Sequence, residues 1–160
     1  MSAVRRGFAI RKAVIGDVHR VQRLVNLYAT KGTMLGLSLS EIYDQVRDFS
    51  VAEGPRRALL GVCALHVVWD NLAEIRSLAV DPKSRRRGLG GALVEHCLDE
   101  ARTLRIPKVF ALTYQPEFFR ALGFERVDKS ELPHKVWRDC LKCSKFPNCD
   151  ETAVLKVLAA

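Results

Sequence analysis

A short segment of the chain combines clustered cations with closely spaced glycines. Residues 78–91 read LAVDPKSRRRGLGG, so an apolar run is followed by a turn, a block of arginines, and Gly88 and Gly90. A helical pattern of apolar residues begins at the same point. Glycines let backbone N–H groups approach a ligand, a helix N-terminus is partly positive, and arginine binds phosphate oxygens. The segment predicts an anion site, with a solvated charge run as the alternative.

A second group of potentially reactive residues lies towards the C-terminus. Cys140, Cys143 and Cys149 follow His134, and together they would supply ligands that suit zinc. Their spacing differs from that of a standard zinc ribbon. We therefore expect reduced thiols that order a loop, and retain zinc as the second interpretation.

The composition fits one globular domain. The 160 residues are 48% hydrophobic, and no stretch approaches the ~18 apolar residues of a membrane span. The N-terminal residues lack the apolar core of a secretory signal, so we expect a cytoplasmic protein without a membrane partner. The net charge of +8 suits an anionic ligand. No motif for DNA or RNA binding accompanies that charge, so we expect no nucleic-acid partner.

Strands and helices alternate along the chain and must position these residues. Apolar runs predict strands at 8–13, 50–53, 58–68, 73–80, 109–113, 124–127 and 153–158. Helical spacing predicts a helix capped by Asp17, a helix capped by Ser38 or Ser40 that reaches Phe49, and helices at 91–104 and 116–123. The order predicts an α/β (α+β) fold whose mixed sheet has about six to seven strands, flanked by about four helices. We expect one domain over residues 1–160, with its core at 8–158 and a cysteine-containing insertion at 129–151.

Two motifs resemble those of the GCN5-related N-acetyltransferases. The spacing Arg85-x-x-Gly88-x-Gly90 after a strand resembles the acetyl-CoA signature of this family, Gln/Arg-x-x-Gly-x-Gly/Ala. The segment at 118–124, FFRALGF, resembles the helix-Gly-Phe segment after the family's fifth strand. The resemblance implies the GNAT fold and acetyl-CoA as co-substrate. It assigns the pantetheine arm to Leu78, Ala79 and Val80, and the phosphates to Arg85, Arg86, Arg87, Gly88, Leu89, Gly90 and Gly91.

A narrower likeness concerns the acceptor. The segments ALHVVWDNLAEIRSLAVDP, LTYQPEFFRALGF and LPHKVWRDCLKC resemble the short, stand-alone N-acetylglutamate synthases of bacterial arginine biosynthesis. This resemblance implies an amino-acid N-acetyltransferase whose small-molecule substrate is glutamate. Whether the chain is a monomer or a homodimer stays open.

Acetyl transfer to an amino acid requires that the α-ammonium group first lose a proton. The resembled synthases place a base at the position of Glu74, in the strand that leads to the cofactor loop. Arg76 is two residues along the strand and could bind a substrate carboxylate through two N–H groups. The alternative is that Glu74 and Arg76 pair with each other on one face of the strand.

The departing thiolate requires a proton donor, and several family members carry a tyrosine four residues before the glycine of the Gly-Phe pair. This chain has Phe119 there, which cannot donate. Thr113 and Tyr114, at the end of the preceding strand, are the candidate donors. Either hydroxyl could instead position the amine.

One departure from the resembled synthases affects the substrate. They carry an arginine in a stretch resembling Leu-Pro-Arg-Ser before the second helix, whereas this chain reads MLGLS at 34–38. Lys31 is the nearest cation and is the candidate that would replace it. Acetyl transfer to glutamine, a polyamine, an antibiotic or a protein N-terminus stays an alternative, as does a non-catalytic acyl-CoA sensor.

Overall fold

The computed structural model describes residues 7–85, 87–132 and 151–158. The chain falls into two units: residues 1–65 with 75–100, and residues 66–74 with 101–160. None of the described helices is long and apolar enough to cross a lipid bilayer.

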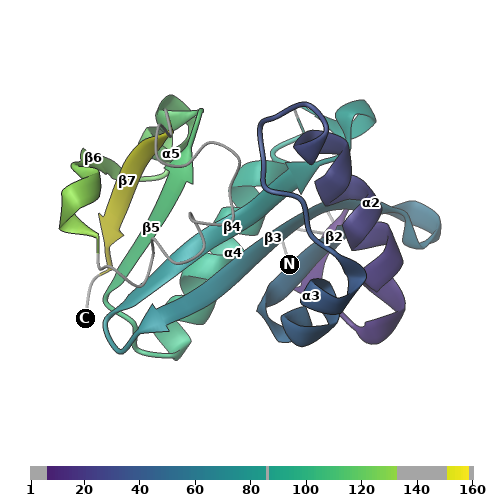
Figure 1. Cartoon of the computed structure of the whole chain (residues 1–160). Coiled ribbons are helices and arrows are strands. Elements are labelled where there is room, and N and C mark those ends of the chain that lie inside the picture. Colours follow the sequence, from purple (N-terminus) through teal and green to yellow (C-terminus); the bar gives the residue numbers. More distant parts are fainter. Residues whose placement is uncertain (1–6, 86, 133–150, 159–160) are drawn as a thin grey trace. The chain divides into compact units, whose positions relative to one another are not determined.

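The described strands form a mixed sheet in the order β1-β2-β3-β4-β5-β7-β6 (Figure 1). β4 and β5 are parallel, whereas β1 with β2, β2 with β3, β5 with β7 and β6 with β7 are antiparallel. This arrangement confirms the expected mixed sheet, which was predicted to have about six to seven strands. The strands are β1 (Ala9–Lys12), β2 (Phe49–Glu53), β3 (Leu59–Trp69), β4 (Leu72–Val80), β5 (Lys108–Thr113), β6 (Glu125–Val127) and β7 (Thr152–Val157).

The expected α-helices are also present in the described residues. Ser38 caps the second of them, because its hydroxyl oxygen accepts the N–H of Glu41 at 3.1 Å. Short 3-10 turns lie at Ile15–Asp17, Val46–Asp48, Pro55–Arg57, Pro82–Ser84 and Lys129–Glu131. The helices are α2 (Val18–Ala29), α3 (Leu39–Asp44), α4 (Leu89–Thr103) and α5 (Pro116–Ala121).

Two expectations for the N-terminal half were wrong. The second helix does not reach Phe49: α3 ends at Asp44, and Phe49 begins β2, where it pairs with Ala64. Burial of its ring and pairing with a distant strand outweigh the local helical spacing. Asp17 does not cap α2 through its side chain. Its carboxylate instead accepts hydrogen bonds from Arg11 at 2.7 and 3.0 Å.

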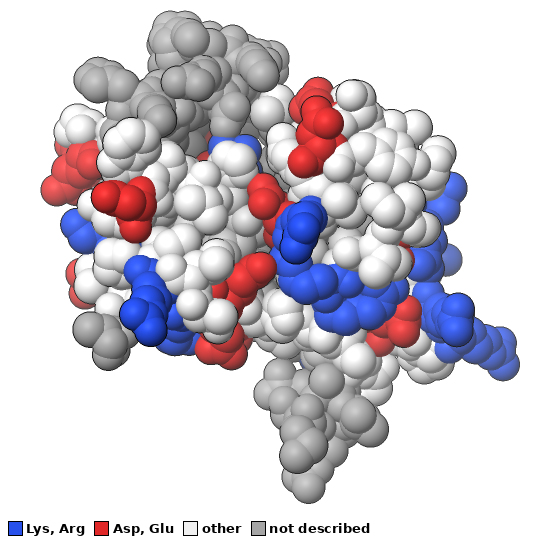
Figure 2. Space-filling view, turned by 90° about the horizontal axis from the view of Figure 1, so that it is seen from below, with Lys and Arg blue, Asp and Glu red and all other residues white. Residues whose placement is uncertain are grey.

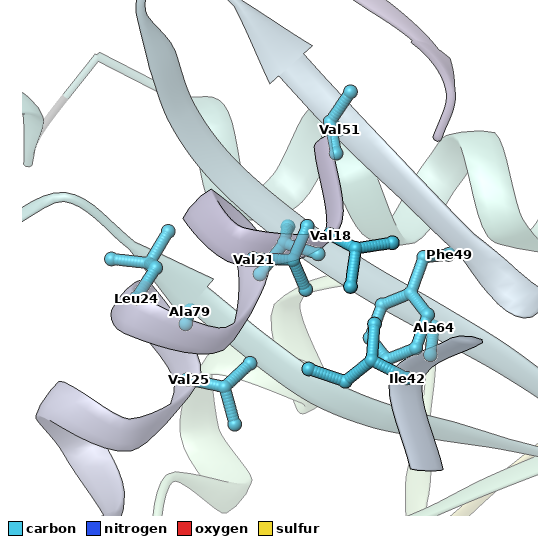
Figure 3. Packing of buried hydrophobic residues seen from close by; sticks show 10 residues of the cluster. Val18, Val21, Leu24, Val25, Ile42, Phe49, Val51, Ala64 and Ala79 are labelled. Atoms are coloured by element: carbon cyan, nitrogen blue, oxygen red, sulfur yellow. The ribbon is translucent and has the colours of Figure 1, made fainter. Parts of the chain in front are cut away.

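The core of the first unit lies between the sheet and helices α2 and α3. Val18, Val21 and Ile42 pack against Phe49 and other strand residues (Figure 3). The side chains that face this core along α2 are Val18, Val21, Leu24 and Val25, the spacing from which the helix was predicted.

The opposite face of the same strands is covered by α4. Val62 of β3 belongs to the core beneath α2, and its neighbour Gly61 points the other way because successive residues of a strand alternate. A Cβ atom at Gly61 would lie 3.0 Å from Leu93 Cδ1 of α4. β3 and α4 therefore approach each other closely where Gly61 has no side chain.

The second unit has its own core, formed by β5, β6, β7 and the start of β4. Phe110 is fully buried there, beside Leu72, Leu132 and Ala153. Near the end of α5, the ring of Phe119 packs edge-on against that of Phe124, with centroids 5.1 Å apart. Gly123 turns the chain between them at a φ of +92°.

Candidate functional site

Local hydrogen bonds shape the loop between β4 and α4. The Asp81 carboxylate accepts the N–H of Lys83 at 3.0 Å, and the Asp81 carbonyl accepts the N–H of Ser84 at 2.8 Å. Ser84 is buried, whereas Arg85 and Arg87 are exposed. The loop thus orders its own backbone and leaves two guanidinium groups at the surface. Arg86 lies outside the described residues.

Gly88 connects this loop to α4. Its φ of +76° lies in the left-handed region that favours glycine, and its carbonyl accepts the N–H of Ala92 at 3.1 Å. Leu89, which is 2% exposed, anchors the start of the helix. The first N–H groups of a helix have no acceptor within it. Gly90 and Gly91 add no side chains over these groups, so the backbone offers donors suited to an anion.

The end of β4 has an irregular backbone that the sequence did not reveal. Ser77 has a φ of +53°, which interrupts the regular strand geometry as a bulge does. Beyond it, the N–H of Asp81 donates to the carbonyl of Leu60 in β3 at 2.8 Å. Because backbone groups of successive strand residues point in opposite directions, those of Val80 point away from β3.

Tyr28, on α2, contacts this open side of β4. Its hydroxyl donates to the Val80 carbonyl at 2.5 Å and accepts from Arg85 Nη2 at 3.2 Å. The Arg85 guanidinium carbon lies 5.9 Å from the centre of the Tyr28 ring, and Lys31 Nζ lies 5.4 Å from it. Tyr28 lies within α2, and no local pattern in the sequence predicts these contacts.

The model of the acetyltransferase (GNAT) family matches residues 34–124, more than half of the chain. The chain belongs to this family.

Proteins of similar sequence carry names that are consistent with membership of the GNAT family. The chain is 38% identical over 149 residues to an uncharacterized N-acetyltransferase of Chlorobaculum tepidum, covering 93% of this chain and 96% of the relative. It is also 38% identical over 130 residues to a Mycobacterium tuberculosis protein named amino-acid acetyltransferase, covering 80% of this chain and 74% of that protein.

Solved GNAT structures match the same fold. Rv2747 from Mycobacterium tuberculosis, in complex with CoA and NLQ, has a TM-score of 0.83 at 33% identity, over 94% of this chain and 99% of that one. N-acetylglutamate synthase from Neisseria gonorrhoeae, complexed with coenzyme A and N-acetyl-glutamate, has a TM-score of 0.87 at 27% identity. The match covers 96% of this chain but 35% of the synthase chain. Both of these similar proteins bind coenzyme A.

In this GNAT chain, the catalytic candidates Glu74, Thr113 and Tyr114 all belong to the second unit. Glu74 is 9% exposed and pairs in register with Phe110 of β5. Paired residues of parallel strands share a face, and side chains then alternate along β5. Thr113 therefore lies on the opposite face from Glu74. Tyr114 follows the last residue of β5 and lies in the bend before α5.

The Thr113 hydroxyl already has a local role. Its oxygen accepts the backbone N–H of Gln115 at 2.8 Å, and the residue is 9% exposed. This bond helps to turn the chain out of β5 ahead of α5. Tyr114 is more accessible, at 36% exposed.

The candidate substrate-binding residues lie in the first unit. Arg76 is half-buried on β4, and Lys31 is exposed just beyond the end of α2. The segment 34–38 carries no arginine, and its backbone is hydrogen-bonded to the side chain of Asn26 in α2. The Asn26 side chain accepts the N–H of Leu37 at 3.1 Å and donates to the Leu37 carbonyl at 3.3 Å.

Of the five cysteines, two lie in the described residues and three lie outside them. His134, Cys140, Cys143 and Cys149 lie outside the described ranges; within those ranges, no cluster of three or more His, Cys, Asp or Glu residues could hold a metal ion. Cys63 and Cys97 are free cysteines and are fully buried. Interaction between the two thiols lowers the pKa of Cys97 and raises the pKa of Cys63.

Proposed function

We propose that this protein is an acetyl-CoA-dependent N-acetyltransferase that acts on the α-amine of an amino acid. Glutamate is the first candidate acceptor, which would make the protein an N-acetylglutamate synthase of arginine biosynthesis. The observation that carries the proposal is the 38% identity to a protein named amino-acid acetyltransferase over 80% of this chain. We further propose that residues 8–158 act as one acetyltransferase domain, with 129–151 as an insertion.

The geometry of the first unit supports binding of acetyl-CoA. The positive φ of Gly88, the amides at the start of α4 and the exposed Arg85 and Arg87 fit an anionic diphosphate. The outward-facing backbone at Leu78–Val80 fits the amide groups of a pantetheine arm. One end of the cofactor would therefore be held by charge, and the other by strand hydrogen bonds.

Acetyl-CoA supplies the acetyl group as a thioester. The bond from the acetyl carbon to sulfur breaks, and a bond from that carbon to the amine nitrogen forms. In this proposal, Glu74 accepts the proton that the amine loses, either directly or through a water molecule. A backbone N–H at Leu78–Val80 donates to the acetyl oxygen as negative charge develops on it.

The proton that the departing sulfur needs is assigned to Tyr114, and the second proton that the nitrogen loses as the amide forms restores the Tyr114 hydroxyl. Strand alternation disfavours Thr113, which lies on the opposite face of β5 from Glu74, and Tyr114 is the more accessible of the two hydroxyls. Thr113 is retained as the second candidate, since its hydroxyl hydrogen is not used by the bond from Gln115.

Arg76 is the proposed partner of the acceptor's carboxylate, because a guanidinium group can bind two carboxylate oxygens at once. The absence of arginine from the sequence at 34–38 favours a second candidate function, acetyl transfer to another amine. Glutamine retains the α-amine and α-carboxylate, so it lies within the first proposal.

A thiol-release assay with acetyl-CoA and a panel of amines tests the proposal. The panel should include glutamate, glutamine, other amino acids, a polyamine and a peptide N-terminus. Turnover with glutamate or another amino acid is expected. Turnover confined to the polyamine or peptide would reject amino-acid acetylation, and no turnover with any amine alongside normal acetyl-CoA binding would favour a sensor.

A further inference from the structure

The ring of Tyr28 gathers two cations from different parts of the first unit. Lys31 Nζ lies 5.4 Å and the Arg85 guanidinium carbon 5.9 Å from the ring centre. Both distances are those of a cation attracted to the electron-rich face of an aromatic ring. Lys31 follows α2 and Arg85 lies in the loop before α4, so the ring joins two segments distant in sequence.

No carboxylate within the described parts of the chain forms a salt bridge with either cation. Both side chains are exposed. Two like charges held beside one ring repel each other, and an anion bound by both would relieve that repulsion. The pair therefore has the charge, and the accessibility, of an anion-binding site.

The position of the pair in the fold indicates which anion it would bind. The Tyr28 hydroxyl bonds both Arg85 and the carbonyl of Val80, the residue at which β4 ends. From there the chain continues through the loop to Gly88 and the first amides of α4. The pair is thus tied to the part of the molecule proposed for the phosphates, beyond the strand segment proposed for the pantetheine arm.

We propose that Lys31 and Arg85 together bind a phosphate group of coenzyme A, and that Tyr28 is the residue that positions them. This inference rests on the proposed function only in taking coenzyme A as the ligand. It gives Lys31 a different role from the substrate-carboxylate contact expected from the sequence. It also extends the cofactor site from the loop before α4 to the end of α2.

Titration calorimetry with coenzyme A and with dephospho-CoA, which lacks the 3′-phosphate, tests the proposal on the full chain. Lys31→Met should weaken coenzyme A binding by about five- to tenfold, as expected for loss of one charge-assisted contact to phosphate. Lys31→Arg should restore most of it. Arg23→Met is the matched control, since it removes an exposed cation from α2 and should leave binding unchanged.

Two further measurements separate the roles of these residues. Tyr28→Phe keeps the ring but removes the bonds to Arg85 and Val80, so it should weaken coenzyme A binding without changing the KM of the amino acid. If the penalty of Lys31→Met disappears with dephospho-CoA, the 3′-phosphate is the ligand. If the penalty persists, the diphosphate is the ligand.

Unchanged coenzyme A binding by Lys31→Met, or a rise confined to the KM of the amino acid, would overturn the proposal. A structural defect would also lower the melting temperature of the ligand-free variant, which circular dichroism would reveal. The calorimetry does not depend on turnover. A protein that binds coenzyme A but acetylates no amino acid would fail the proposed function and leave this inference standing.

Discussion

Glu74 is a buried carboxyl group, 9% exposed, on the strand that leads to the loop proposed to bind the cofactor. If it removes the proton of the amine, Glu74→Gln should lower kcat by about 100-fold or more, the usual contribution of a general base. The affinity for acetyl-CoA should change little, because the loop proposed to bind the phosphates is untouched. Steady-state kinetics combined with calorimetry measures both quantities; full activity in Glu74→Gln would exclude this residue as the base.

Thr113 is the last residue of β5 and Tyr114 lies in the bend after it, so variants of these adjacent hydroxyl residues should differ. Tyr114→Phe should lower kcat by about 10-fold or more if its hydroxyl protonates the departing sulfur. Thr113→Val should change kcat less, but it should destabilise the turn after β5 by about 1 kcal/mol through loss of the Gln115 bond. The reverse ranking in kcat would transfer the role to Thr113.

Asp17 is 2% exposed and holds the guanidinium groups of Arg11 and Arg20. The hydrogen bond from Arg11 is the main cause that lowers the pKa of this carboxyl group to about 2. A carboxyl group with a lowered folded-state pKa stabilises the fold above its unfolded pKa and loses that contribution as the pH falls through its folded value. This part of the stability should therefore be lost between about pH 4 and pH 2.

Asp17→Asn should accordingly lower the free energy of unfolding by about 1–3 kcal/mol at pH 7. The difference from the unaltered protein should shrink below pH 4, as measured by urea unfolding at several pH values. Glu53→Gln is the control, because Glu53 also binds Arg11 at 2.9 Å but is half-exposed, where a pair contributes less than about 1 kcal/mol. Equal effects of the two changes at all pH values would refute this account.

At the scale of elements, the distortion of β4 at Ser77 lies between Glu74 and the stretch Leu78–Val80 that is proposed to bind the cofactor. A φ of +53° is strained for a β-branched residue and unstrained for glycine. Ser77→Val should lower the melting temperature and raise the KM for acetyl-CoA, because relief of the strain shifts Leu78–Val80. Ser77→Gly should leave both nearly unchanged. Thermal unfolding and steady-state kinetics of the pair provide the check, and equal behaviour of the two variants would contradict it.

The elements themselves were largely predictable because their signals are local. Alternation and helical spacing placed the strands and helices within a few residues, and residue type alone named Ser38 as one of two candidate caps. Phe49 was wrongly expected in a helix because its strand conformation depends on pairing with Ala64, which lies far along the chain in β3. The hydrogen-bond partners of Asp17 were unpredictable for the same reason. Arg11 of β1 donates both to Asp17 and to Glu53 of β2, and this arrangement depends on the pairing of the strands.

The candidate site was predictable where backbone conformation governs it and hidden where side chains meet across the fold. Gly88 was singled out as a glycine of the predicted anion loop, and its φ of +76° is one that favours glycine. Ser77 adopts a similarly positive φ, but serine is not a residue type from which a positive φ is predicted. Tyr28 follows the helical pattern of α2, but its hydroxyl bonds Val80, which lies far along the chain. Contacts of this kind depend on tertiary structure and leave no local pattern.

At the scale of the molecule, the net charge of +8 bears on the binding of an anionic cofactor. Acidic side chains lie among the basic ones on the face shown in Figure 2, so that face is not uniformly basic. Attraction should therefore come mainly from cations near the ligand, and salt screens such contacts when they are exposed. The dissociation constant of coenzyme A should rise between low and physiological ionic strength.

Coenzyme A should also raise the melting temperature, because a ligand that binds the folded state stabilises it. The gain is about 2.7 kcal/mol when the ligand concentration is 100 times the dissociation constant. Gly88→Asp should abolish this shift, since it places a side chain and a negative charge at the start of α4. Differential scanning fluorimetry of both proteins with and without coenzyme A tests this, and an equal shift in Gly88→Asp would argue against the loop as the phosphate site.

The close approach of Gly61 to Leu93 has a consequence for genetic screens. Leu93 lies one turn along α4 from Leu89 and the glycines that follow it. A side chain at Gly61 would press on Leu93 and move that turn, although Gly61 itself is buried. A screen for variants that grow poorly at low cofactor supply should thus recover substitutions in the middle of β3. The positions recovered would include buried residues as well as residues of the binding surface.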